Sequence, residues 1–191
     1  VKTRLGWDDN SINIDEVAER LQDIGVSALS IHARTRAQMY KGHSDWSHIA
    51  RVKNNPRITM PIFGNGDIDS PEKALEYKNK YGVDGIMIGR AAIGYPWIFN
   101  EIKHFFKTGE HLAKPTVADR VEAVRNHLTW AMDWKGERHG IVETRPHYTN
   151  YFKGIHSFKT YKQQLVTLDK PEELFAVLDE IIDAYSGYEV V

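Results

Sequence analysis

The chain has 191 residues, with 25 Lys and Arg against 26 Asp and Glu, so its formal net charge is −1. That balance excludes a uniformly basic nucleic-acid binder but leaves room for a local basic patch. The sequence contains no Cys, which excludes a disulfide framework, a Cys-ligated zinc site and a thiol nucleophile within these residues. No apolar run approaches the length of a membrane helix and no signal peptide is visible, so we expect a cytoplasmic protein with no membrane contact.

Four short apolar runs in the first part of the chain predict buried β-strands. They are Val1–Leu5, Ala28–His32, Met60–Gly64 and Gly85–Ile88. The runs are continuous rather than alternating, which is typical of strands covered on both faces. Their spacing fits a βα repeat, in which a helix crosses over before the next parallel strand. The chain opens without Met inside the first predicted strand, so we interpret it as a fragment of a longer protein.

Local end signals predict helices between and after these strands. Asp15 is a candidate cap for a helix that ends at Gly25, and Ser70 precedes Pro71 at the start of a helix that Gly82 ends. A further helix is expected from Pro96 to Gly109.

After Lys114-Pro115 the strand patterns stop and helical patterns continue to the end. Thr116 to Asp119 resembles a capping box before a long helix that ends near Gly136, and Asp169 to Glu172 opens the last helix. We therefore predict an α/β fold over residues 1–114, with four βα units forming the C-terminal half of a (β/α)8 TIM barrel, followed by a small all-α domain over residues 115–191. A small open sheet is the alternative, and the loops described next favour half a barrel.

Glycine-rich loops follow the last two predicted strands. Gly64-Asn65-Gly66-Asp67 comes after the third strand, and Gly89-Arg90 begins the loop after the fourth. Glycines allow backbone N–H groups to approach an anion closely, and the guanidinium of Arg90 offers a forked donor. In a βα barrel, phosphate usually binds at the loops after the last two strands. The two loops together predict a phosphate site. Asn65 and Asp67 could be acid–base residues, but the pattern favours Asn65 and the backbone near Gly66 positioning a ribityl chain, with Asp67 capping or bracing the loop.

Basic side chains end the first two strands. Lys2 and Arg4 are two residues apart, so both point to the same side of a strand, where they would need an anion or a polar ligand. Lys2 could hold negative charge on a flavin ring and Arg4 could bind an imide-like carbonyl. His32, Arg34 and Arg36 alternate after the second strand and are expected to gather donors at the same rim. No paired carboxylates or metal-ligand cluster stand out, so no metal site is predicted.

These motifs together resemble the tRNA-dihydrouridine synthase family. The matching stretches lie in order over residues 1–110 and the resemblance is weaker over the helical tail. The stretches are Val1–Trp7, Ile31–Gly42, Gly64–Ile68 and Gly85–Gly94. The resemblance implies an FMN-dependent barrel enzyme that reduces a uridine in tRNA to dihydrouridine, with NADPH reducing the flavin. It also implies a C-terminal helical domain.

The resemblance also implies roles for individual residues. FMN would be held by Lys2 and His32 at the ring and by Asn65, Gly66, Asp67, Gly89 and Arg90 along the ribityl phosphate. Arg4 would contact the substrate uracil, and Arg34 is a second candidate for that contact. A hydride adds to one carbon of the uracil double bond and an acid protonates the other, while cations stabilise the enolate that forms. The family's acid is a Cys in the first half of the barrel, so no residue of this chain is predicted to be catalytic.

The helical tail carries a basic, aromatic stretch. From Lys135 to Gln163 there are six Lys and Arg against two acids, interleaved with Tyr and Phe residues. Such a surface suits an RNA backbone and unpaired bases, although most of the aromatics are expected to be core. Lys153, Lys159 and Lys162 are the predicted contacts to tRNA. Two positions depart from the family pattern: Pro146, which could weaken an RNA contact or start a helix, and Tyr95, which should not abolish the phosphate donors.

Two other functions remain open from the sequence. One is another FMN barrel that acts on a small molecule, such as a dihydroorotate-type dehydrogenase, although a small substrate does not need a basic helical tail. The other is a non-catalytic RNA-binding fragment. Half a barrel would leave two sheet edges and an interior face open, which predicts self-association and weak or absent FMN binding by the isolated fragment. The sequence does not indicate which tRNA uridine would be modified.

Overall fold

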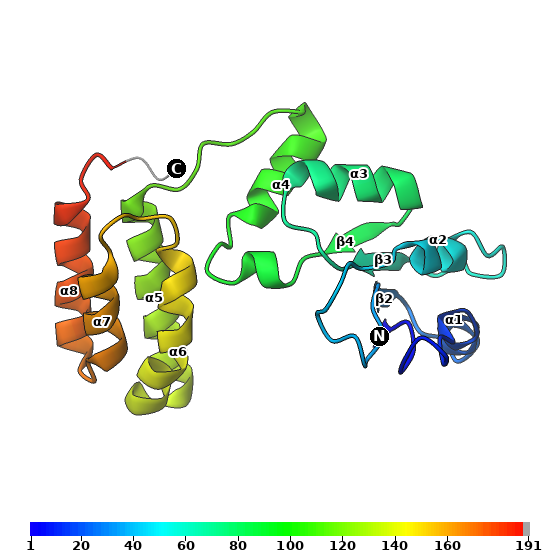
Figure 1. The fold of residues 1–191 in the computed structure, drawn as a ribbon, viewed down its shortest axis with the longest axis horizontal. Coiled ribbons are helices and arrows are strands. Elements are labelled where there is room, and N and C mark those ends of the chain that lie inside the picture. The colour runs from blue at the N-terminus through cyan, green and yellow to red at the C-terminus, as the bar shows by residue number, and fades with distance from the viewer. Residues whose placement is uncertain (189–191) are drawn as a thin grey trace. The chain divides into compact units, whose positions relative to one another are not determined.

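The computed structural model describes residues 1–188 and separates them into two compact units. The first unit comprises Val1–Ala92 and Ile98–His111, and the second comprises Ile93–Trp97 and the chain from Leu112 onward. Figure 1 shows that the sheet lies in the first unit and that the second is helical. The segment Ile93–Trp97, which includes Tyr95, belongs to the helical unit although the sequence analysis assigned it to residues 1–114.

The first unit is built on a four-stranded parallel sheet in the order β1-β2-β3-β4. The strands are β1 (Lys2–Arg4), β2 (Leu29–His32), β3 (Ile62–Asn65) and β4 (Gly85–Met87). All four predicted strands are therefore present, and the α/β class is confirmed. The backbone register aligns Arg4 with His32, His32 with Asn65, and Asn65 with Met87. Because side chains at aligned positions share a face, this register places three polar residues and Met87 in one row near the carboxyl ends of the strands.

Helices follow the strands of the first unit in chain order. They are α1 (Ile14–Asp23), α2 (Ser47–Lys53), α3 (Pro71–Tyr81), the short 3-10 helix η1 (Arg90–Ala92) and α4 (Ile98–Thr108). The predicted ends of α3 are confirmed, since the Ser70 hydroxyl accepts a hydrogen bond from the Lys73 N–H at 3.3 Å and Gly82 is left-handed with φ of 64°. Both devices satisfy backbone groups at a helix end.

Two local expectations for this unit need correction. Asn13, not Asp15, precedes α1, and the Asp15 carboxylate instead accepts hydrogen bonds from the Arg51 guanidinium. The sequence analysis also did not predict α2, which begins after Trp46 without a side-chain cap. Asp15 does not cap α1 because it forms a long-range ion pair with Arg51. The helix α2 could not be predicted because the sequence before it carries no end signal.

Trp46 packs the loop after β2 against the sheet. Its side chain is 1% exposed, and it stacks on Tyr81 and meets Tyr77 edge-on. A Cβ atom on Gly64 would lie only 2.0 Å from the Trp46 ring, so the strand approaches the indole more closely than any side chain allows. The Trp46 Nε1 donates to the Gly66 carbonyl at 3.0 Å and so fixes the start of the loop after β3.

The second unit contains the helices α5 (Val117–Lys135), α6 (Glu137–Tyr151), α7 (Lys159–Thr167) and α8 (Pro171–Ala184). The predicted capping box is present, with Thr116 and Asp119 each accepting from the other's backbone. Pro146 lies inside α6 and does not begin a helix, which corrects one reading of that position. The core of this unit is apolar and includes Leu128, Ile141, Leu165 and Leu178.

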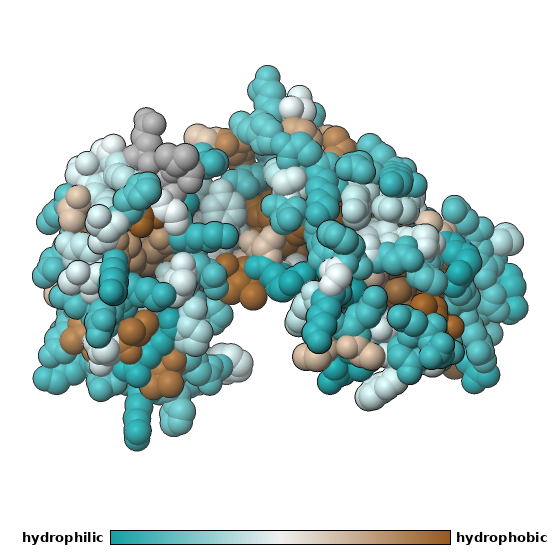
Figure 2. Space-filling model, viewed as in Figure 1, coloured by the Kyte–Doolittle hydropathy of each residue, from teal (hydrophilic) through white to brown (hydrophobic). Residues whose placement is uncertain are grey.

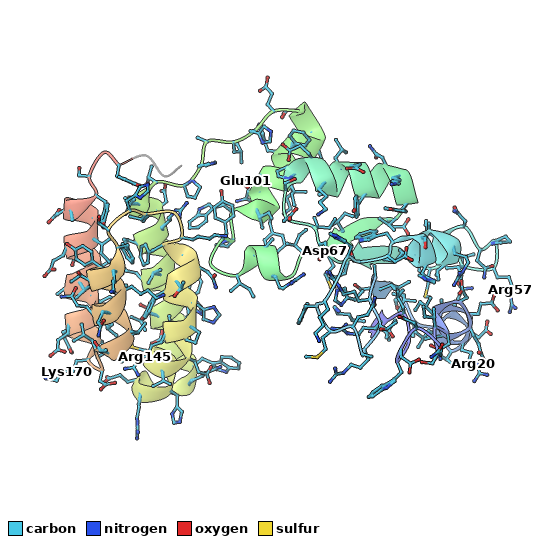
Figure 3. The ribbon with its side chains drawn as sticks, viewed as in Figure 1. Arg20, Arg57, Asp67, Glu101, Arg145 and Lys170 are labelled. Atoms are coloured by element: carbon cyan, nitrogen blue, oxygen red, sulfur yellow. The ribbon has the colours of Figure 1, made fainter. Side chains whose placement is uncertain are left out.

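Hydrophilic residues cover most of the face drawn in Figure 2, and hydrophobic residues form small groups on it. Arg145 and Lys170, labelled in Figure 3, lie at the same end of the helical unit, where Arg145 donates to the Leu168 carbonyl and the Asp169 carboxylate. Among residues 1–188 no helix combines the length and the apolar character that crossing a membrane requires.

Candidate functional site

A hollow of about 710 Å³ lies in the first unit where the loops after the strands meet. Its volume falls in the range of about 300–1,000 Å³ that is common for small-molecule sites. The structure brings together here all seven residues predicted to bind the cofactor and both arginines predicted to bind uracil. They are Lys2, His32, Asn65, Gly66, Asp67, Gly89, Arg90, Arg4 and Arg34.

Asp67 is the central acceptor of the site. It follows β3, as labelled in Figure 3, and it adopts the left-handed conformation (φ of 55°) that Asp tolerates better than most residues. One carboxylate oxygen accepts from the Arg34 guanidinium and the Ser44 N–H, both at 2.8 Å, and the other accepts from Arg90 at 3.0 Å. Asp67 therefore links the loops after β2, β3 and β4.

The charge of Asp67 is maintained by these partners. Burial alone would raise the pKa of its carboxyl, but the hydrogen bonds from Arg34 and Ser44, with the Arg34 charge, lower it to about 2. The group is therefore an anion at neutral pH and a poor proton donor. This geometry agrees with the expectation that Asp67 braces the loop.

Arg34 is a buried cation with one unsatisfied donor. The residue is 1% exposed, and its guanidinium donates to the Gly42 carbonyl at 2.6 Å as well as to Asp67. Its Nη1 atom is buried without a hydrogen-bond partner. A buried donor without a partner raises the free energy of the folded chain. We therefore expect a ligand or a solvent molecule in the hollow to accept a hydrogen bond from this nitrogen.

The pKa of His32 reflects its burial and the positive charge that surrounds it. The residue is 6% exposed. Burial, followed by the positive charges of Arg4, Lys2 and Arg34, lowers the pKa of His32 from 6.5 to about 4, and the negative charge of Asp67 raises that pKa only slightly. Burial and then Arg4 also lower the pKa of Lys2. The imidazole is therefore neutral at pH 7, and the surroundings are positive enough to favour an anion.

Tyr40 is a member of the site that the sequence analysis named in the Ile31–Gly42 stretch without giving it a role. Its ring lies 4.6 Å from the Arg90 guanidinium carbon and 5.8 Å from that of Arg4, with the His32 ring 6.2 Å away. Arg4 in turn donates to the Thr35 and Met39 carbonyls of the same loop, at 2.8 and 3.1 Å. Tyr40 thus holds two cations by cation–π contact. The only feature of the sequence that could have indicated a role for Tyr40 is that it is an aromatic residue in a loop that contains Gly.

The glycines and Asn65 shape the floor of the hollow. Asn65 donates to the Met87 carbonyl at 2.7 Å and so joins β3 to the end of β4. Gly66 has a φ of 132°, and a Cβ there would lie 2.8 Å from the Ser44 Cβ. Around Gly89 a Cβ would meet no atom closer than 4.0 Å, so that backbone is open to a ligand.

Other predicted residues lie elsewhere. Arg36 is not among the residues that line the hollow, and its guanidinium carbon lies 6.0 Å from the Trp7 ring, which corrects the expectation that it joins the rim. Lys153, Lys159 and Lys162 are exposed residues of the helical unit. No group of three potential metal ligands occurs among residues 1–188.

The donor set defines what the hollow can bind. Its lining carries five cationic side chains against two acids, Asp67 and Asp69, and Asp67 is already occupied by two of the cations. The five are Lys2, Arg4, Arg34, Lys73 and Arg90. Forked donors, open glycine backbone and a neutral imidazole suit a ligand with a phosphate group and a polar ring system. The fold and site therefore define a class: an α/β protein with an anion-accepting pocket at the carboxyl ends of parallel strands.

Comparison with known proteins identifies the family. The family model described as dihydrouridine synthase (Dus) matches residues 1–186, and the chain belongs to this family. It is 43% identical over 182 residues to a probable tRNA-dihydrouridine synthase 1 of Synechocystis, covering 95% of this chain and 50% of that protein. It is 36% identical over 183 residues to tRNA-dihydrouridine synthase B of Shewanella oneidensis, covering 96% of this chain and 56% of that protein.

The chain spans about half the length of the curated relatives it matches. Among solved structures, a mandelate oxidase mutant with (S)-mandelic acid is similar with a TM-score of 0.41 and 14% identity, over 94% of this chain and 57% of that one.

Proposed function

We propose that this chain is the cofactor-phosphate and tRNA-binding part of an FMN-dependent tRNA-dihydrouridine synthase. The proposal extends the family assignment to a cofactor, a substrate and individual residues. The observation that carries it is the convergence of Lys2, Asn65, Gly89 and Arg90 on one hollow lined mainly by cations.

The sheet is proposed to be the C-terminal half of a (β/α)8 barrel. Two observations support this. Each strand pairs with the one that precedes it in the chain, with no reversal of order. The row from Arg4 to Met87 lies on the opposite face of the strands from Gly64, which packs on Trp46. Residues on the inner face of a barrel form such a row at the mouth. The second unit is then the helical domain that binds tRNA.

The residues present fit FMN. Arg90 and the backbone near Gly66 and Gly89 would bind the phosphate, and Asn65 would orient the ribityl chain. Lys2 and His32 would bind the ring, and Arg4 would contact uracil, with Asp67 holding Arg34 and Arg90 in place. Bound FMN would supply the hydride that reduces the uracil, with NADPH as the electron donor. No residue of this chain is proposed as the general acid.

Deletion of the gene that encodes this chain tests the function. We expect dihydrouridine to disappear from at least one position of the organism's tRNA, measured by position-specific mapping. The intact gene should restore the modification, and the same gene carrying Arg90→Ala should restore it poorly. A dihydrouridine map that is the same with and without the gene contradicts the proposal.

A further inference from the structure

A second hollow, of about 280 Å³, lies between α5 and α6 of the helical unit. We call it the tryptophan groove. Its lining combines two indoles, two imidazoles and one Lys–Glu pair. These residues are His127, Trp130, Ala131, Trp134, Lys135, Glu143, Thr144 and His147. None of them was singled out as a candidate site residue above.

The two indoles are unusually open to solvent. Trp130 is 68% exposed and Trp134 is 82% exposed. They are four residues apart on α5, so they lie on the same side of the helix, one turn from each other. Neither can be explained by the core of the unit, and exposed aromatic groups of this size mark interaction sites.

The two helices beneath the groove are closely packed. A Cβ on Gly140 would lie 2.5 Å from the Met132 backbone nitrogen, so α5 and α6 are in close contact. The Thr144 hydroxyl is buried and donates to the Gly140 carbonyl at 2.8 Å. The centres of the His127 and His147 rings are 5.0 Å apart. The Nδ1 atom of His127 lies 3.3 Å from the Tyr151 hydroxyl. Burial and then His147 lower the pKa of His127, so it offers a neutral hydrogen-bonding group.

The aromatic faces of the groove, together with the basic sequence that follows it, indicate the occupant. The Lys135 ammonium lies 4.9 Å from the Trp134 ring and also pairs with Glu143. The sequence that continues from the groove, Lys135 to Gln163, is the basic stretch of the chain, with six Lys and Arg against two acids. Flat aromatic faces beside a Lys and before a basic stretch of sequence suit an unpaired nucleotide, because every base has a stacking face and the backbone is anionic. The groove itself holds one Lys, Lys135, which Glu143 pairs, so the exposed faces of Trp130 and Trp134 rather than charge favour an RNA base as the occupant.

We infer that the tryptophan groove binds an unpaired RNA nucleotide, whose base stacks on Trp130 and Trp134. The inference rests on the proposed function for the identity of the RNA, a tRNA. It adds a site that contributes stacking rather than phosphate neutralisation, and that site is distinct in residues from Lys153, Lys159 and Lys162.

Alanine variants of the two indoles test the inference against a matched control. Trp7 is also 68% exposed but lies in the first unit, so Trp7→Ala controls for loss of an exposed indole. With an unmodified tRNA transcript as the probe, we expect Trp130→Ala and Trp134→Ala each to weaken binding at least about fivefold. Trp7→Ala should bind within about twofold of the parent chain. Equal urea midpoints for all three variants would verify folding.

Salt dependence separates this inference from the proposed function. Replacing Lys153, Lys159 and Lys162 with Ala should flatten the dependence of affinity on salt, whereas the Trp variants should leave that slope unchanged. If only the Lys variant weakens binding, the stacking inference is wrong and tRNA binding stands. If the parent chain binds no tRNA, both are wrong.

Fluorescence provides a direct readout of stacking. A single-stranded oligoribonucleotide should quench the indole fluorescence of the parent chain and of Trp7→Ala, and the Trp130→Ala/Trp134→Ala double variant should lose most of that quenching. A duplex of equal length should quench less, since its bases are already stacked. Equal quenching of the double variant and the parent, or a preference for the duplex, would overturn the inference.

Discussion

Asp67 has more influence on the first site than its single charge suggests. It accepts from Arg34, Ser44 and Arg90, and Arg34 is almost fully buried. The sequence analysis predicted that Asp67 caps or braces its loop. Its partners could not be predicted, since Arg34 and Arg90 lie far from it in the chain and meet it only through the parallel register of the strands.

The first prediction concerns the stability that Asp67 provides. Asp67→Asn keeps the size and the tolerance for a left-handed backbone but removes the charge opposite Arg34. Because it leaves a buried cation without its anion, we expect a loss of about 3 kcal/mol in the free energy of unfolding, measured in urea. Asp15→Asn is the control: its ion pair with Arg51 is much more exposed, so the loss should be below about 1 kcal/mol. Equal losses would contradict the role assigned to Asp67.

The pH dependence of stability follows from the same group. The pKa of Asp67 in the folded chain is about 2, below the ordinary 3.8. The unfolded chain therefore binds more protons between those values, and the stabilisation is complete above pH 4 and is lost as the pH falls from 4 to 2. We expect the stability difference between the parent chain and Asp67→Asn to shrink over that interval. A difference that stays constant from pH 6 to pH 2 would rule this out.

His32 provides a readout of anion binding. Its pKa of about 4 lies below the usual 6.5, so its protonation opposes folding and its contribution to stability is lost as the pH falls from 6.5 to 4. An anion beside Arg4 and Arg34 would partly cancel the charges that lower this pKa. We expect inorganic phosphate to shift the His32 titration upward in NMR spectra. A His32 titration that is the same with and without phosphate would contradict this prediction.

At the scale of the element, helix ends that are coded locally were predictable. Ser70, Pro71 and Gly82 define α3, and Thr116 with Asp119 defines the start of α5, because each signal acts within one turn. The short α2 has no such signal. Its position depends on Trp46, which is fixed by tertiary contacts with Gly64, Tyr77 and Tyr81. Likewise, Tyr40 could be assigned to the site only once its loop was placed beside Arg4 and Arg90.

Two glycine substitutions distinguish packing from ligand approach. Gly64→Ala would place a methyl group inside the Trp46 ring, so we expect a loss of about 1–3 kcal/mol in the free energy of unfolding. Gly89→Ala has open space, so its unfolding midpoint should match that of the parent chain. If a phosphate approaches the Gly89 backbone, this second variant should nevertheless bind inorganic phosphate more weakly, which calorimetry would measure. Undisturbed anion binding would exclude close approach at Gly89.

At the scale of the whole molecule, the exposed side of the sheet predicts self-association. Phe63 is 37% exposed and lies on the same face of the strands as the row of site residues. A partly open aromatic beside unpaired strand edges favours contact between copies. We expect sedimentation velocity to show concentration-dependent dimers or larger species, and Phe63→Glu to reduce them. Ile24→Glu, at a 77% exposed position on the end of α1, should not. A monomer at all concentrations would contradict the prediction.

The chain passes between its two units three times, because Ile93–Trp97 belongs to the helical unit while the residues on both sides of it belong to the other. Trp97 packs against the apolar cluster of that helical unit. If the chain is cut after His111, Trp97 therefore stays with the first product and is lost from the helical one. The helical product, which starts at Leu112, would expose the apolar residues that Trp97 covers in the intact chain. Expression of either half alone should be designed around this interleaved segment, for instance by supplying residues 93–97 as a separate peptide.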